Sequence, residues 1–178
     1  PSFKDSKKND YKAISLVGPW NDEWHVIKMF VDQTGTAAMA EWYKHIHDFV
    51  AGRTPLYMYM EANATQDIIL NQVNEYIFKN NWGFMVAGDE RAKGDKFSRI
   101  ESLLEPLNRN QKLWFNEKEK DNPHMVRMKD QMLALEPALS AHDDGPDSLH
   151  GAVSLGREKI QLMVPPTFAR RRKNLKRF

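Results

Sequence analysis

Hydrophobic and polar positions change their spacing along the chain, from short alternating runs to longer runs with helical periodicity. β-Branched and aromatic residues over Tyr11–Val17, followed by Gly18-Pro19, predict a strand and a turn. The alternation over Trp24–Val31 predicts a second strand, which pairs with the first as an antiparallel hairpin. Residues 36–50 then carry apolar side chains at helical spacing, and Gly52 stands where a C-terminal cap belongs.

The rest of the chain alternates further strands and helices. The apolar run Leu56–Met60 is typical of a buried central strand, and we expect it beside the first-strand position. Shorter strands are expected over 83–87 and 112–116. Helices are expected over 65–78, over 96–107 (where Pro106 should end the helix), from Pro123 to about 135, and from about 142 to 163. This order predicts an α/β fold whose mixed sheet has an antiparallel hairpin and helices on both faces.

The amino-acid composition limits which class of protein this is and which kinds of active site it can have. A chain of 178 residues, 41% hydrophobic and 28% charged, fits one globular domain, here 1–163, followed by a tail, 164–178. No run approaches the ~20 apolar residues of a membrane-spanning helix. The absence of cysteine excludes disulfides, thiolate metal sites and a cysteine nucleophile. Phosphate-binding, dinucleotide-binding and serine-hydrolase glycine motifs are also missing.

Positive charge is concentrated at the C-terminal end. Residues 168–178 contain six basic and no acidic side chains, whereas the rest of the chain has more acidic than basic residues. This asymmetry predicts a polyanion or an acidic protein as the partner of the tail. The alternative is a solvated terminus without a partner. As candidates for DNA contact we single out Arg170, Arg171, Arg172 and Lys173.

Glu61 is a candidate site residue because it directly follows the apolar run Leu56–Met60. Open α/β sheets bind their ligands outside the carboxyl ends of the strands. A carboxylate at that position is well placed to hold a hard cation. The alternative interpretation is that Glu61 is simply the first polar residue after a buried strand.

A second candidate is the acidic cluster Asp143, Asp144 and Asp147 at the start of the last helix. Asp144 and Asp147 are three residues apart, so a helix projects both from the same side, where a cation or a basic partner must neutralise them. The cluster is therefore a candidate metal site, with His142 and His150 as possible second-layer partners or a general base. The alternative interpretation is that these acids cap the helix and favour its dipole, which explains one or two of the three.

Lys93, Lys96 and Arg99 gather between a predicted strand and a predicted helix, where they could meet phosphates. A solvated helix face is the alternative interpretation. His45 and His47 are two apart on a helix, cannot face one ligand together, and are expected at the surface or an edge.

Four segments, in order, resemble the nuclease domain of phage large terminase subunits. PSFKDSKKNDYKAISLVG is similar to the family's first hairpin, and MYMEAN to its strand-end Glu motif. KGDKFSRIESLLEPL, followed by KLWF, resembles the family's Lys-x-x-Arg-Ile helix. HDDGPDSLHGAV resembles the terminal Asp-Asp-x-x-Asp-Ala motif, with Ser148 in place of Ala. The resemblance covers roughly residues 1–160 and implies an RNase H-like fold.

The resemblance implies a metal-dependent endonuclease that cleaves concatemeric double-stranded DNA during viral DNA packaging. Carboxylates from three chain segments would hold two Mg²⁺ or Mn²⁺ ions. By this correspondence Glu61 is the middle ligand, and Asp144 and Asp147 are the C-terminal ligands, without a decision on which dominates. The implied partners are an ATPase domain on the same polypeptide, a small terminase subunit and a portal protein. The implied location is the cytoplasm of an infected or prophage-carrying bacterial host.

One departure from the family pattern affects the expected activity. The family's first-strand Asp immediately precedes the Pro that is Pro1 here, so that acid and most of its strand are missing from this sequence. Asp5 and Asp10 would lie beyond the strand end and are poor substitutes, so the fragment is expected to bind metal weakly and could lack activity. Two alternatives stay open: another RNase H-like nuclease or resolvase, and a non-catalytic docking or DNA-binding domain of a packaging motor.

Overall fold

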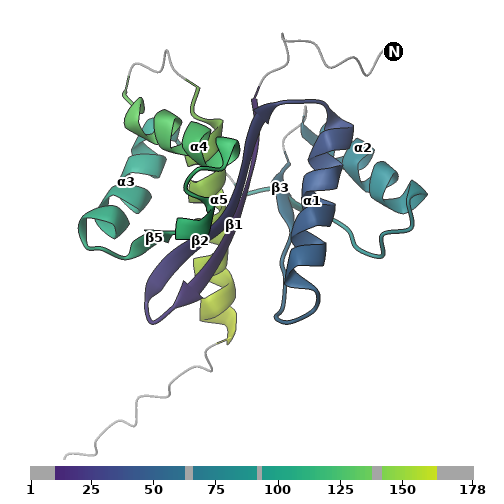
Figure 1. Cartoon of the computed structure of the whole chain (residues 1–178), viewed down its shortest axis with the longest axis horizontal. Coiled ribbons are helices and arrows are strands. Elements are labelled where there is room, and N and C mark those ends of the chain that lie inside the picture. Colours follow the sequence, from purple (N-terminus) through teal and green to yellow (C-terminus); the bar gives the residue numbers. More distant parts are fainter. Residues whose placement is uncertain (1–10, 63–65, 92–93, 138–141, 164–178) are drawn as a thin grey trace, which may run out of the picture.

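A long antiparallel hairpin forms the centre of the molecule. The computed structural model describes residues 11–62, 66–91, 94–137 and 142–163 (Figure 1). Strands β1 (Tyr11–Trp20) and β2 (Glu23–Gln33) pair over their whole length, which confirms the predicted hairpin. The turn lies at Asn21 and Asp22, with φ of 49° and 60°, rather than at Gly18-Pro19. Asn and Asp tolerate this left-handed conformation, which matches the twist of the paired strands.

The remaining strands form two separate parallel pairings. Strand β5 (Leu113–Phe115) extends the hairpin sheet next to β2, whereas β3 (Tyr59–Glu61) pairs with β4 (Ala87–Asp89) in a second sheet. The mixed α/β fold is confirmed, but the described strands form two sheets, in the orders β1-β2-β5 and β3-β4, instead of the one central sheet that was expected. The strand expected over 83–87 is shifted, since Val86 fills the core just before β4 begins.

The helices agree with the sequence pattern apart from their ends. They are α1 (Thr36–Val50), α2 (Gln66–Lys79), α3 (Lys96–Arg109), α4 (Pro123–Leu133) and α5 (Asp144–Met163), with a short 3-10 helix over Glu117–Glu119. Pro106 lies inside α3 instead of ending it. Ala51 rather than Gly52 caps α1, in the left-handed region with its N–H bonded to the carbonyl of His47. None of the described helices is both long and apolar enough to cross a membrane.

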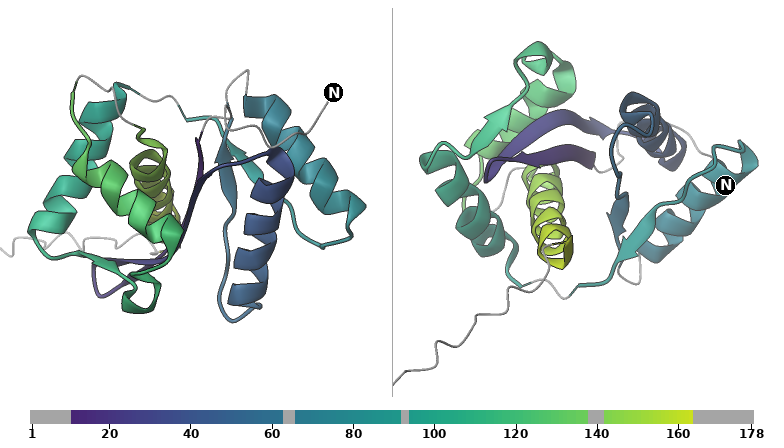
Figure 2. Two further views of the ribbon diagram at one scale, coloured as in Figure 1. Left: turned by 45° about the horizontal axis from the view of Figure 1, so that its top comes forward. Right: turned by 90° about the horizontal axis from the view of Figure 1, so that it is seen from below.

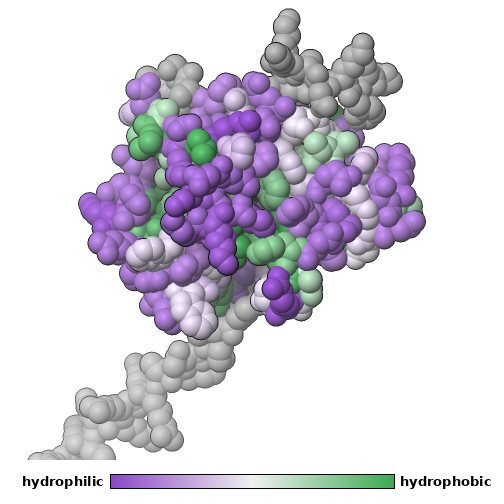
Figure 3. All heavy atoms as spheres, in the orientation of Figure 1, coloured by the Kyte–Doolittle hydropathy of each residue, from purple (hydrophilic) through white to green (hydrophobic). Residues whose placement is uncertain are grey.

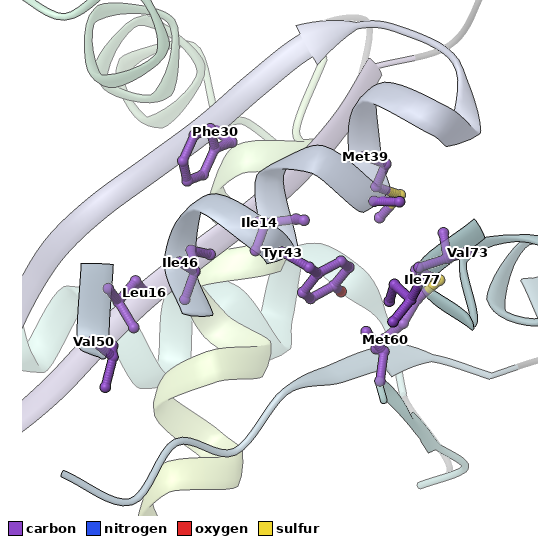
Figure 4. Close-up of a cluster of buried hydrophobic side chains, with 12 residues drawn as sticks. Ile14, Leu16, Phe30, Met39, Tyr43, Ile46, Val50, Met60, Val73 and Ile77 are labelled. Carbon is purple, nitrogen blue, oxygen red and sulfur yellow. The ribbon is translucent and has the colours of Figure 1, made fainter. Parts of the chain in front are cut away.

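Two hydrophobic cores lie on opposite faces of the hairpin, as the period-two alternation of strand side chains requires. On one face Ile14, Leu16 and Phe30 pack against α1, α2 and β3 (Figure 4). On the other face Trp24, Val26, Met29 and Val31 pack against α3, α4, α5 and β5. Helices therefore cover both faces, as predicted, with α1 and α2 on one side and α3, α4 and α5 on the other (Figure 2).

Helix α5 runs along the hairpin in the same direction as β1. Near its start Ser148 Oγ lies 2.9 Å from Ser15 Oγ, and further along Gly156 packs against the ring of Trp24. Trp24 pairs with Pro19, close to the end of β1. The position of α5 matters for function because its first turn carries the acidic cluster.

Candidate functional site

A cavity of about 960 Å³ lies between the two sheets. Its walls are successive residues of β1 from Tyr11 to Pro19, the segment Leu56–Glu61 except Met58, and one side of α5 and of α1. In the face shown in Figure 3, which is mostly hydrophilic, hydrophobic residues show along the middle, between the two halves of the molecule. Four carboxylate residues line this same cavity: Glu61, Asp89, Asp144 and Asp147.

Glu61 and Asp89 are register partners at the carboxyl ends of the parallel strands β3 and β4. Glu61 thus occupies the strand-end position that the sequence predicted, and it is only partly exposed. Asp89 is 6% exposed and was missed by sequence reasoning. The available signal was the same as for Glu61, because Asp89 is the first carboxylate after the run Gly83–Ala87.

Arg91 holds the buried carboxylate of Asp89. The Arg91 Nε and Nη2 atoms donate to the two oxygens of Asp89 at 2.7 and 2.9 Å, and Nη1 donates to Glu158 of α5 at 2.6 Å. The hydrogen bonds with Asp89, and to a smaller extent the one with Glu158, raise the pKa of Arg91 above its ordinary value. Arg91 therefore links the end of β4 to α5 and compensates the charge of Asp89.

Basic side chains of α3 neutralise two acids of the cluster. Lys96 Nζ donates to Asp143 Oδ1 at 2.5 Å and lies 3.6 Å from Asp147, and Arg99 Nη2 lies 2.7 Å from Asp147 Oδ1. Burial alone would lower the pKa of Lys96, but the hydrogen bond with Asp143 and the nearby carboxylates outweigh burial and raise that pKa. The neutralising partner that the sequence required for this cluster is thus a pair of basic residues within the chain.

Asp144 is the first residue of α5 and lines the cavity. A carboxylate in the first turn is stabilised by the positive end of the helix dipole. Asp147, one turn later, donates its backbone N–H to the carbonyl of Asp143, which starts the helix. The sequence predicted Asp144 and Asp147 on one side of the helix, and both line the cavity.

The predicted accessory residues fall in different places. His150 Nδ1 lies 3.1 Å from Arg99 Nη1, whereas His142 is exposed and packs against the ring of Tyr11. Lys96 and Arg99, proposed as DNA contacts, are engaged with the acids. His45 is exposed, as expected at the surface. Lys93 and the tail residues Arg170, Arg171, Arg172 and Lys173 lie outside the described residues, as do Asp5 and Asp10.

The carboxylates have the chemistry of a Mg²⁺ or Mn²⁺ site, because hard oxygen ligands are what these ions prefer. Among the described residues, however, no three His, Asp or Glu side chains lie close enough together to hold a metal ion. Asp89 and Asp147 already share their oxygens with arginine. The described acids therefore do not complete a metal site by themselves.

Comparisons with known proteins identify the fold. The chain is similar to the human cytomegalovirus terminase nuclease domain, with a TM-score of 0.59 and 13% identity over 87% of this chain and 79% of that one. It is also similar to the Mn-soaked, inhibitor-bound form of that domain, with a TM-score of 0.63 and 12% identity over 88% and 81%. No family model matches the sequence, and no curated protein matches it either. The chain therefore has the RNase H-like fold of a terminase nuclease domain.

Proposed function

We propose that this chain is the endonuclease domain of a viral DNA-packaging terminase and cleaves concatemeric double-stranded DNA with divalent metal ions. The observation that carries the proposal is the convergence of carboxylates from β3, β4 and α5 on one cavity. Support comes from the fold, which is similar to that of one solved viral terminase nuclease domain, a structure of which was soaked with manganese. The setting we propose is the packaging machinery in the cytoplasm of an infected bacterial host.

Glu61 and Asp144 are the carboxylates that we propose as metal ligands. Asp147 suits this role less well, because it is paired with Arg99 and Lys96. If Asp147 turned to a metal ion instead, these two half-buried positive charges would lose their partner. A divalent ion held at Glu61 and Asp144 would activate a water molecule and stabilise the leaving oxygen of the phosphodiester. Two carboxylates are too few for tight binding, so we propose that a further ligand comes from outside the described residues.

Nicking of supercoiled plasmid in the presence of Mn²⁺ tests the proposal. It is measured both on this chain and on a version that continues before Pro1, because the first-strand acid is expected there. Glu61→Gln removes a ligand charge and is expected to abolish nicking in whichever version is active. Glu75→Gln, a change of the same size on the exposed side of α2, should leave nicking unchanged. Equal nicking by the Glu61→Gln variant and its parent would contradict the proposed role of Glu61.

A second candidate function is a non-catalytic docking or DNA-binding domain that keeps the fold. The observation that favours it is the compensation of Asp89, Asp143 and Asp147 by basic side chains of the same chain. A stable ion-pair network needs no metal to neutralise its acids. DNA binding without nicking, in both versions and with either metal, would favour this function over the nuclease.

We further propose that the basic tail 164–178 contacts the DNA backbone. Each neutralised phosphate releases counterions, so the affinity falls with salt at a slope of roughly 0.9 per phosphate contact. Deleting residues 168–178 removes six positive charges and should reduce the log–log slope by a few units. An unchanged slope after the deletion would exclude DNA as the partner of the tail and favour an acidic packaging protein.

A further inference from the structure

The two carboxylates that we propose as metal ligands belong to different parts of the molecule (Figure 2). Glu61 ends β3, whose Met60 packs in the core with α1 and α2. Asp144 begins α5, which packs through Leu149 and Val153 in the core on the other face of the hairpin. The described strands form separate sheets, and a cavity lies between them. In this part of the chain, neither strand pairing nor a shared core therefore fixes the distance between the two carboxylates.

Arg91 is attached to the end of β4 through Asp89. Its backbone N–H donates to Asp89 Oδ1 at 3.3 Å, and its Nε and Nη2 atoms donate to Oδ1 and Oδ2 at 2.7 and 2.9 Å. A bidentate pair of this kind fixes the direction of the planar guanidinium group. Because Asp89 is buried, the pair is held within this part of the molecule and does not turn freely in solvent.

The third nitrogen of the guanidinium group reaches α5. Nη1 of Arg91 donates to Ser154 Oγ at 3.0 Å and to Glu158 Oε1 at 2.6 Å. Ser154 and Glu158 are four residues apart, so they are neighbours on one face of the helix. The Arg91 side chain is thus held at both ends by groups on regular elements, β4 on one side and α5 on the other.

Glu61 follows the position of Arg91 because β3 and β4 pair at this end. Glu61 and Asp89 are register partners, and the Ala62 N–H donates to the Asp89 carbonyl at 3.0 Å. Asp144 begins the same continuous helix that Arg91 contacts. A fixed spacing between β4 and α5 at Arg91 is therefore also a fixed spacing between Glu61 and the first turn of α5.

We propose that Arg91 is a positioning residue, which sets the distance between Glu61 and the first turn of α5. Its consequence for metal binding rests on the proposed function, since an ion held between Glu61 and Asp144 needs both carboxylates at a fixed spacing. Lys159 of α5 lies 5.2 Å from the ring centre of Tyr59 and is a second contact between these parts. Loss of the Arg91 link should therefore widen the range of spacings without separating the two parts.

The link can be cut at its α5 end without uncovering the buried charge of Asp89. Ser154→Ala combined with Glu158→Ala removes both acceptors of Arg91 Nη1. The bidentate pair of Arg91 with Asp89 stays in place in this double variant. The Glu158 side chain is about half exposed, so its removal leaves the hydrophobic core unchanged and the chain should fold.

Spin-label distances measure the spacing directly, because the chain has no cysteine of its own. Labels at Asn71→Cys in α2 and Arg157→Cys in α5 report on the two parts, and both positions are exposed. Pulsed EPR should give a distribution of label distances roughly twice as wide in the double alanine variant as in its parent. The matched control, Glu101→Ala with Ser102→Ala, changes the same residue types at exposed positions of α3 and should equal the parent.

Binding of Mn²⁺ to chains without labels tests the consequence for the proposed site. Paramagnetic broadening of the Glu61 amide should need about tenfold more Mn²⁺ in the double alanine variant than in the parent, because residues that orient metal ligands typically change affinity by this much. The control variant on α3 should titrate as the parent does.

Two results would overturn the proposal. Equal widths of the distance distribution in the double alanine variant and its parent would show that the Arg91 link does not set the spacing. A wider distribution with an unchanged Mn²⁺ titration would show that this spacing does not position the ligands. If the parent chain binds no Mn²⁺ at Glu61, the metal proposal fails, whereas the label distances still decide whether Arg91 sets the spacing.

Discussion

Substituting alanine for Gly156 tests how α5 is seated on the hairpin, and hence how the acidic cluster is positioned. A methyl group at Gly156 would lie 2.5 Å from Cη2 and 2.7 Å from Cζ3 of Trp24, far inside van der Waals contact. Trp24 is 5% exposed and cannot swing away without disturbing the core around it. Gly151, five residues earlier in α5, offers a matched control because a methyl group there meets nothing within 4 Å.

The two variants are expected to change stability in opposite directions. Replacing glycine by alanine inside a helix stabilises it by about 0.5–1 kcal/mol. Gly151→Ala should show this gain. At Gly156 the gain is opposed by overpacking, which costs about 1–3 kcal/mol. Gly156→Ala should therefore be destabilised by up to about 2.5 kcal/mol. Since 1 kcal/mol corresponds to roughly 2–4 °C in a chain of this size, the two melting temperatures should differ by several degrees.

Urea unfolding followed by circular dichroism and by tryptophan fluorescence measures both variants. The midpoint should rise for Gly151→Ala and fall for Gly156→Ala, with unchanged slopes. Combining Gly156→Ala with Trp24→Phe, a smaller ring, should recover part of the loss, because the two positions are in contact. Equal stabilisation by both alanines would show that α5 does not pack on Trp24 as described, and would refute the reasoning.

Two further predictions concern ion pairs. The Lys28 hydrogen bond lowers the pKa of Glu119 below its ordinary value of 4.5, so this carboxylate stabilises the fold above that pH and loses its effect as the pH falls through the lower folded-state pKa. Glu119→Gln should thus be less stable than the parent at pH 7 and approach it below pH 4 in thermal unfolding, whereas a constant difference would contradict the linkage. Arg99→Met leaves Asp147, which is about one-sixth exposed, with Lys96 as its remaining basic neighbour, and should cost about 1–3 kcal/mol in urea unfolding. Arg109→Met, which breaks an exposed pair, should change stability by less than about 0.5 kcal/mol, and equal losses for the two arginines would refute the assignment.

The periodicity of the sequence predicted the elements well because most of them are amphipathic and locally punctuated. The alternation over β1 and β2 and the helical spacing of α1 follow directly from which face each element buries. The predicted boundaries of the elements were wrong where tertiary contacts determine where an element ends. Pro106 continues α3 because α3 buries Leu104 and Leu107 on either side of it. The turn after β1 depends on Asn21 and Asp22 rather than on the more obvious Gly18-Pro19.

The candidate site was predicted only in part, because its geometry depends on which elements become neighbours. The strand-end position indicated Glu61 as a candidate, whereas Asp89, its register partner at the end of β4, was not predicted. The sequence placed basic residues and acids in separate functional groups, whereas the fold joins them, with Lys96 and Arg99 of α3 paired to the acids that begin α5. The division of the sheet was also not predictable, since hydrophobicity identifies strands but not the order in which they pair.

Paramagnetic broadening by Mn²⁺ tests the proposed metal role of the acid-lined cavity most directly. Two-dimensional NMR spectra of the amides are recorded while Mn²⁺ is added to the chain. Broadening should appear first at Glu61 and Asp144, at micromolar to millimolar Mn²⁺, and should be lost there in the Glu61→Gln variant. Broadening that begins at surface acids such as Glu117, or that is unchanged by Glu61→Gln, would contradict a metal site in this cavity.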